Sequence, residues 1–310
     1  MNQPPDKSHG LRFGWIVPKP GGVEFDVRIG GAILAPEVWQ DIQSIVDVVC
    51  EIRPYLIDFL ILEEDFRAIS TDLQVALKDR FEAFPFNHIG GTSSVMAHVA
   101  VQRTFSNFLS STSAFRARTT RRLKQSYGRS SSPVADFEAA LQRAENDSFA
   151  FRLLHNLRNY AQHNDSPIDI IPIHGERDPA GNINLTITLC LRRDTLLEDK
   201  RMAPYLMSEL KGCAELIPLL PLIRAGMAEY RRLFLVLIGQ RHSRFAQYAQ
   251  YIQAVLLASP MPKGAIPVIW EGEVPETQEF RTNVHSFSLD EFLLLTRVVN
   301  QLGYEPLSCA

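Results

Sequence analysis

The sequence predicts a mainly α-helical protein in which short β hairpins are inserted into or appended to a helical bundle, an α+β arrangement overall. Apolar residues recur over long stretches with the spacing of amphipathic helices. Shorter segments rich in β-branched and aromatic residues are bounded by Gly and Pro, which is typical of strands and turns. No internal repeat points to a solenoid instead.

The composition allows a large packed core, since 45% of the 310 residues are hydrophobic. We expect the polar residues 1–10 to form a flexible tail. Residues 11–310 are expected to form a single globular unit. Its helical core is expected at about 36–258, and its β segments at 11–35, 168–191 and 266–287.

The N-terminal part of the chain predicts a hairpin followed by long helices. Strands are expected at 11–17 and 23–34, on either side of a Pro-Lys-Pro-Gly-Gly turn. Helices are expected at 38–53 and 55–84. Pro54 marks a break or a kink between them, because proline lacks the backbone N–H that a helix interior uses.

The middle of the chain predicts two further helices. A Gly-Gly-Thr-Ser-Ser run at 90–94 indicates a turn and an N-cap before a helix over about 94–127. Ser132 and Pro133 then begin a helix that runs to His163, since proline is favoured in the first turn of a helix.

The C-terminal half alternates between strands and helices. A hairpin is expected from strands at 168–173 and 183–191. The helical pattern resumes over about 203–257, with Pro218 and Pro221 as candidate breaks. The remaining expected elements are strands at 266–270 and 280–287 and a helix at 289–302.

Charge and cysteine content narrow the class of protein. The formal net charge is −3, so contact with nucleic acid would need a local basic surface. The four cysteines, Cys50, Cys190, Cys213 and Cys309, lack metal-ligand spacing and are expected to be reduced thiols in a cytoplasmic protein. No apolar stretch has the roughly 20 residues that cross a bilayer. His174 and Glu176 could bind a metal ion, but no other residue has the spacing to complete the site. We expect no membrane segment, no metal and no cofactor.

The most informative motif is Arg158-Asn159-Tyr160-Ala161-Gln162-His163, at the end of the helix that follows Ser132. A fixed cation and an imidazole are the parts that cleave RNA without a metal, because one offsets phosphate charge and the other moves a proton. The helix around the motif predicts a buried stripe at Ala150, Leu153, Leu154, Leu157 and Ala161.

A second row of that helix holds His155, Asn159 and His163 at four-residue intervals, so Asn159 is placed to orient the ring of His163. Arg158 is rotated from His163 by about 140° in a regular helix. The two side chains could converge if the helix ends at His163, which Pro167 favours, or if a two-fold dimer brings two motifs to one cleft.

At these residues the sequence resembles the HEPN superfamily of helical proteins, whose active members carry Arg-x4-6-His, often with a polar residue after the Arg. The resemblance implies a metal-independent ribonuclease, commonly dimeric, of the kind found in toxin–antitoxin, abortive-infection and antiviral systems. It implies that Arg158 and His163 are catalytic and that Asn159 is the polar orienting residue. RNA, a second copy of the chain, and an antitoxin or defence-system protein are the implied partners.

The expected reaction uses His163 as general base on the RNA 2′-hydroxyl or as general acid on the leaving oxygen, while Arg158 stabilises the phosphoryl charge. DNA, which lacks that hydroxyl, should resist. Two alternatives remain. These residues could be structural groups at a helix C-terminus, or the protein could be a noncatalytic helical module that binds nucleotide, RNA or another protein.

A basic cluster upstream of the motif is a candidate RNA-binding surface. Its members lie in a stretch without acidic residues, which could neutralise phosphates. They are Arg116, Arg118, Arg121, Arg122 and Lys124, with Arg129 just beyond. The alternative is a solvated helix end, since cations favour the last turns of a helix. His155 is a weaker candidate, for which a structural role is the simpler interpretation.

Overall fold

The fold was analysed in a computed structural model, which describes residues 11–19, 25–33, 35–82, 92–163, 168–170, 173–177, 179, 183–239, 262, 264–271, 284–286 and 289–303. The chain divides into two compact units, each described here by itself. Unit 1 comprises Met1–Pro54 and Ile238–Ala310, and unit 2 comprises Tyr55–Leu237. The expectation of one globular unit stays a prediction.

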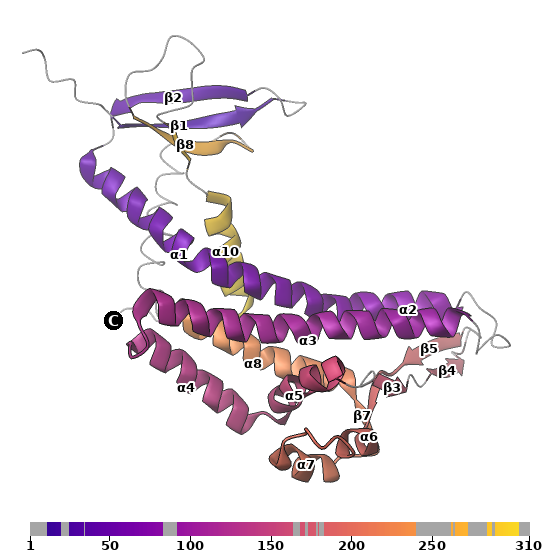
Figure 1. Ribbon diagram of the computed structural model, residues 1–310. Helices are drawn as coiled ribbons and strands as arrows, with labels where there is room; N and C mark the ends of the chain where they lie inside the picture. Colours follow the sequence, from indigo (N-terminus) through magenta and orange to yellow (C-terminus); the bar gives the residue numbers. More distant parts are fainter. Residues whose placement is uncertain are drawn as a thin grey trace, which may run out of the picture. The chain divides into compact units, whose positions relative to one another are not determined.

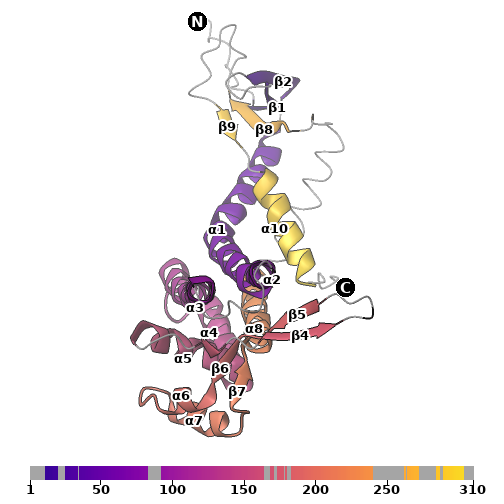
Figure 2. The ribbon, with the colours of Figure 1, turned by 90° about the vertical axis from the view of Figure 1, so that its right-hand side faces the viewer.

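Unit 1 is built on a four-stranded antiparallel sheet that joins the two ends of the chain (Figures 1 and 2). Its order is β2-β1-β8-β9, formed by Phe25–Ile33, Leu11–Pro18, Ile266–Glu271 and Val284–Ser286. Leu11 pairs with Glu271, and Ile16 pairs with Ile266. The predicted segments at 11–35 and 266–287 therefore belong to one sheet.

The helices of unit 1 are the first part of α1 (Pro36–Arg67) and α10 (Leu289–Gln301). The helix predicted at 289–302 is thus confirmed. Arg53 of α1 and Glu291 of α10 form an ion pair at 2.7 Å, which links the two helices. Helix α1 buries Ile45 and Ile52, and α10 buries Leu295, as expected for amphipathic helices.

Unit 2 is mainly helical, with long helices packed side by side (Figures 1 and 2). The end of α1 and the π-helical turn η1 (Ala68–Asp72) lead to α2 (Leu73–Glu82). The remaining helices are α3 (Thr92–Tyr127), α4 (Ser132–Asp147), α5 (Phe149–His163), α6 (Arg193–Leu197), α7 (Pro204–Lys211) and α8 (Leu219–Gly239), which belongs to unit 2 up to Leu237.

Stacked aromatic rings join four of these helices into one core. The rings of Phe59 on α1 and Phe234 on α8 stack with centroids 4.1 Å apart. Tyr230 on α8 meets Phe115 on α3 edge to face at 6.0 Å and Phe151 on α5 at 4.9 Å. All five rings are essentially inaccessible to water, so α5 is anchored against α3 and α8.

The strands of unit 2 form two small antiparallel sheets. The first has the order β3-β6-β7, from Ile168–Ile170, Cys190–Arg192 and Leu216–Pro218. The second pairs β4 (Ile173–Arg177) with β5 (Ile183–Ile187). The hairpin predicted at 168–191 is therefore divided between two sheets. Strand β3 pairs with β6, while β4 and β5, which lie between them in the sequence, pair with each other.

The structure differs from the sequence prediction at two helix boundaries: of the break or kink predicted at Pro54 the break is absent, and the helix predicted from Ser132 is not continuous. Helix α1 continues through Pro54, and its flanking residues Ile52, Tyr55 and Leu56 are buried, which offsets the hydrogen bond that proline removes. The single helix predicted from Ser132 to His163 is divided at Ser148, whose extended backbone (φ −116°, ψ 106°) separates α4 from α5. The Ser148 hydroxyl accepts the N–H of Phe151 at 3.2 Å and so caps α5.

The helix predicted over 203–257 also proves to be composite. Within it lie α7, strand β7 and α8, so the chain leaves the helical state before Pro218 and returns to it at Leu219. The predicted helical residues 240–257 and the turn at 20–22 lie outside the described residues.

Candidate functional site

Helix α5, which carries the Arg-Asn-x-x-x-His motif, lies against the interior of unit 2. Of the predicted buried stripe, Leu153, Leu154 and Leu157 are completely buried and Ala150 is buried, whereas Ala161 is only partly buried. Helix α8 comes close to α5 at Gly226, where an added Cβ would lie 2.3 Å from Leu154 Cδ1. The absence of a side chain at Gly226 therefore allows the two helices to pack this closely.

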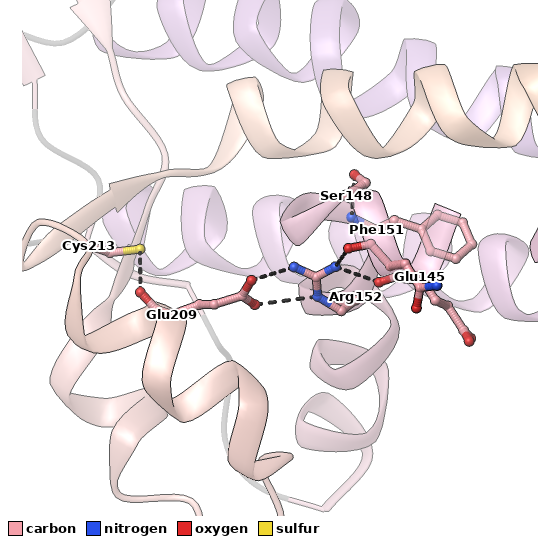
Figure 3. Close-up of polar contacts among 7 residues, drawn as sticks. Glu145, Ser148, Phe151, Arg152, Glu209 and Cys213 are labelled. Atoms are coloured by element: carbon pink, nitrogen blue, oxygen red, sulfur yellow. Dashed lines mark hydrogen bonds and ion pairs between the residues drawn. The ribbon is translucent and has the colours of Figure 1, made fainter. Parts of the chain in front are cut away.

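Arg152 ties the start of α5 to two neighbouring elements (Figure 3). Its Nη1 donates to the carbonyl of Glu145 and, at 2.7 Å, to the carbonyl of Asn146, at the end of α4. Its Nε and Nη2 donate to the carboxylate of Glu209 on α7. These contacts satisfy carbonyls that the end of α4 leaves without helical partners, and they hold Glu145 in place.

The structure describes the side chains of Arg158 and Asn159 but not that of His163. Arg158 is partly buried, and its Nε has no hydrogen-bond partner among the described residues. Asn159 is exposed. His163 is the last residue of α5, as expected, but its side chain lies outside the described residues. The hydrogen bond from Asn159 to His163 and the convergence of Arg158 with His163 stay predictions.

The basic cluster on α3 is divided between two faces of the helix. Arg118 and Arg122 both bind Asp58 of α1, with 2.8 Å from Arg118 Nη1 to Asp58 Oδ1. Asp58 is only 4% exposed, so these two arginines neutralise a buried carboxylate. Arg118 and Arg122 are therefore engaged in packing α3 against α1.

The other face of α3 lines a groove with a cavity volume of about 940 Å³. We call it the α3–α4–α5 groove, since its lining residues come from these three helices and the turn after α3. Its charged and titratable members are Arg116, Arg121, Lys124, Arg129, Glu138, Glu145 and His155. Four cations face two carboxylates, so the groove has a net positive charge when His155 is neutral.

The cations of the α3–α4–α5 groove are not equivalent. Arg116 forms an ion pair with Glu145, and Lys124 forms one with Glu138 at 2.7 Å. Arg121 is exposed and has no ion pair within the part of the chain that the structure describes. Arg129 follows Gly128, whose φ of +84° lets the chain reverse between α3 and α4.

His155 contributes a neutral imidazole to this groove. Burial lowers its pKa first, and the nearby charges of Arg116 and Arg158 lower it further, while Glu145 opposes them. At neutral pH the ring is therefore uncharged, with one nitrogen that donates and one that accepts a hydrogen bond. The sequence made His155 only a weaker candidate, with a structural role preferred, since nothing in its local pattern shows that α5 and the distant Arg116 line one groove.

The site has the chemistry of anion binding. The guanidinium groups and the amine can bind phosphate, and a neutral imidazole can exchange a proton. The described residues contain no cluster of three or more His, Cys, Asp or Glu that could hold a metal ion. Cys50, Cys190 and Cys213 are free thiols, whereas Cys309 lies outside the described residues. Across the described helices, none combines the length and apolar character of a membrane span.

The chain matches no protein-family model, no curated protein and no solved structure.

Proposed function

We propose that this protein is a metal-independent endoribonuclease of the HEPN type. The observation that carries the proposal is the position of Arg158 on α5. It lies three residues from His155 of the cationic α3–α4–α5 groove and five residues from His163, where α5 ends. An RNA strand bound in the groove would pass the helix that bears both proposed catalytic residues. Guanidinium and imidazole groups would then act on the same phosphate.

The proposed reaction is an internal transesterification. The imidazole of His163 takes the proton of the 2′-hydroxyl, and the 2′-oxygen bonds to the adjacent phosphorus. The bond from phosphorus to the 5′-oxygen breaks, and that oxygen takes a proton from water or from a second imidazole. The products are a 2′,3′-cyclic phosphate and a 5′-hydroxyl. Arg158 stabilises the negative charge on the phosphoryl oxygens in the transition state.

The proposed assembly is a cytoplasmic homodimer. A two-fold axis would bring both copies of the motif to one cleft, so that Arg158 and His163 of different subunits could act on one phosphate. Such a nuclease would serve as a toxin or antiviral-defence effector held in check by an antitoxin or another defence-system protein. Size-exclusion chromatography with light scattering measures the dimer directly.

The test is RNA cleavage by the full-length protein in EDTA, with single-stranded DNA as a negative control. Arg158→Ala and His163→Ala should each lower the rate by about 100-fold or more, the usual effect of removing a charge-stabilising or proton-transfer group. Arg143→Ala and His98→Ala are matched controls, because Arg143 is exposed on α4, His98 lies near the start of α3, and neither lines the groove.

Two results would reject catalysis by these residues. One is a His163→Ala protein that cleaves RNA as fast as the wild type. The other is tight RNA binding without cleavage by a folded dimer, which would favour the noncatalytic binding module.

A further inference from the structure

We infer that the α3–α4–α5 groove holds a single RNA strand, with Arg121 and Arg129 as its phosphate contacts and His155 as a hydrogen-bonding contact to the sugar or base. This rests on the proposed function for its choice of RNA, but it does not depend on cleavage. It assigns binding roles to Arg129 and His155, and it removes Arg118 and Arg122 from the surface that binds RNA.

The shape of the groove favours a strand over a compact ligand. Its cations lie on the last turns of α3 and continue into the turn beyond it. Arg116 and Lys124 are separated by about 12 Å along the helix axis at 1.5 Å per residue. Successive phosphates of a single strand could therefore contact successive cations.

The ion pairs decide which cations are available to an incoming phosphate. Arg116 and Lys124 already face Glu145 and Glu138, so a phosphate there would have to displace or approach a carboxylate. Arg121 and Arg129 line the same groove without an ion pair to any residue that the structure describes. A phosphate that binds these two displaces only water and counterions, which is favourable at moderate salt.

His155 adds a contact that does not depend on charge. It lines the groove with the cations of α3, and burial together with Arg116 disfavours its protonated form. A neutral imidazole can donate to a base edge and accept from the 2′-hydroxyl, which distinguishes RNA from DNA. It also lies on the helix that carries Arg158, so it would position the strand toward the motif.

The test measures binding by the full-length His163→Ala protein, so that the RNA should stay intact. The ligand is a fluorescein-labelled single-stranded RNA of mixed sequence, and fluorescence anisotropy is recorded over a range of KCl concentrations. The double variant Arg121→Ala, Arg129→Ala should weaken RNA binding at least about 10-fold. It should also lower the slope of log K against log salt by about 1.4, near 0.7 for each phosphate that the protein no longer neutralises. Arg143→Ala with Arg232→Ala is the matched control, since both arginines are exposed outside the groove.

His155→Gln should weaken binding about three- to tenfold and leave the salt slope unchanged, because it changes a hydrogen bond rather than a charge. Unchanged affinity and slope in the Arg121→Ala, Arg129→Ala protein would overturn the inference. Unchanged affinity in His155→Gln would remove His155 from the site. Competition by ATP at a concentration comparable with that of the RNA would also overturn it, since the groove would then be a small-nucleotide site.

Different experimental results would reject RNA binding in the groove and cleavage by Arg158 and His163. A wild-type protein that cleaves RNA, with binding unaffected by Arg121 and Arg129, would retain the nuclease and reject the groove. A wild-type protein that does not cleave, but whose RNA binding depends on Arg121 and Arg129, would reject the nuclease and retain the groove. Circular dichroism and thermal unfolding of each variant separate these results from misfolding.

Discussion

Gly226 on α8 provides a direct test of how helix α5 is held in unit 2. In Gly226→Ala the new methyl group would lie 2.3 Å from Leu154 Cδ1, well inside the distance at which carbon atoms repel. Leu154 is completely buried and cannot rotate into solvent. One helix must therefore shift, or Leu154 must take a strained rotamer.

Two opposing effects determine the stability change. Overpacking in a close-packed core costs about 1–3 kcal/mol. Replacing Gly by Ala inside a helix gains about 1 kcal/mol from backbone entropy. The contact is short and the site is fully enclosed, so we expect the upper part of the overpacking range and a net loss of about 1–2 kcal/mol. For a unit of this size, Tm should fall by about 2–8 °C.

The assay is urea unfolding of the wild type, Gly226→Ala, Leu154→Val and the double variant. Leu154→Val shortens the side chain that the methyl group meets, so the double variant should be more stable than the sum of the single effects predicts, by about 1 kcal/mol. Gly212→Ala is the control, because the nearest atom to its Cβ, a carbonyl oxygen, lies at 3.4 Å. A Gly226→Ala protein as stable as the wild type, with no coupling to Leu154, would refute the close packing of α5 and α8.

Three further predictions concern groups around the site. Asp58→Asn should lower the free energy of unfolding by about 2 kcal/mol in urea titrations, because two partly solvated arginines lose a buried carboxylate. The control Asp41→Asn, on an exposed side chain of α1, should change the free energy of unfolding little. Ser148→Ala should cost about 1 kcal/mol in thermal unfolding through loss of the α5 cap, and Ser148→Asp should restore most of it. Burial raises the pKa of Tyr230 from 10 to about 12. The unfolded chain therefore loses that proton first, and stability that is complete below pH 10 should fall by about 2–3 kcal/mol as pH rises from 10 to 12. If Tyr230→Phe shows the same loss in that range, the tyrosine is not its cause.

Local periodicity predicted much of the secondary structure. The buried stripe of α5 follows from its apolar spacing, because a helix places such residues on one face whatever it packs against, and Leu153, Leu154 and Leu157 are indeed buried. A break at Pro54 is absent because tertiary packing around it overrides a strong local signal, and the boundary at Ser148 was not predicted because a serine is a weak signal on its own. Burial around Pro54 preserves a helix there, whereas a hydroxyl cap at Ser148 allows the chain to begin a new one.

Strand partners could not be predicted from local pattern. The alternation in β1 indicates a strand but carries no information about which distant segment pairs with it, and the structure pairs it with β8 as well as with its hairpin neighbour β2. The same limit applies to β3 and β6, which pair across an intervening hairpin. Such pairings depend on contacts that form only when the chain is folded.

The amino-acid sequence by itself determined that the chain is mainly helical with short strands, and that an arginine, an asparagine and a histidine share the end of one helix. It also determined that α3 is rich in cations. Only the tertiary structure decided which of those cations face Asp58, which face Glu138 and Glu145, and which line the groove without such a partner among the described residues. The physical reason is that arginine and lysine are cations near neutral pH by their own chemistry, whereas their availability to a ligand depends on the carboxylates that other helices bring beside them.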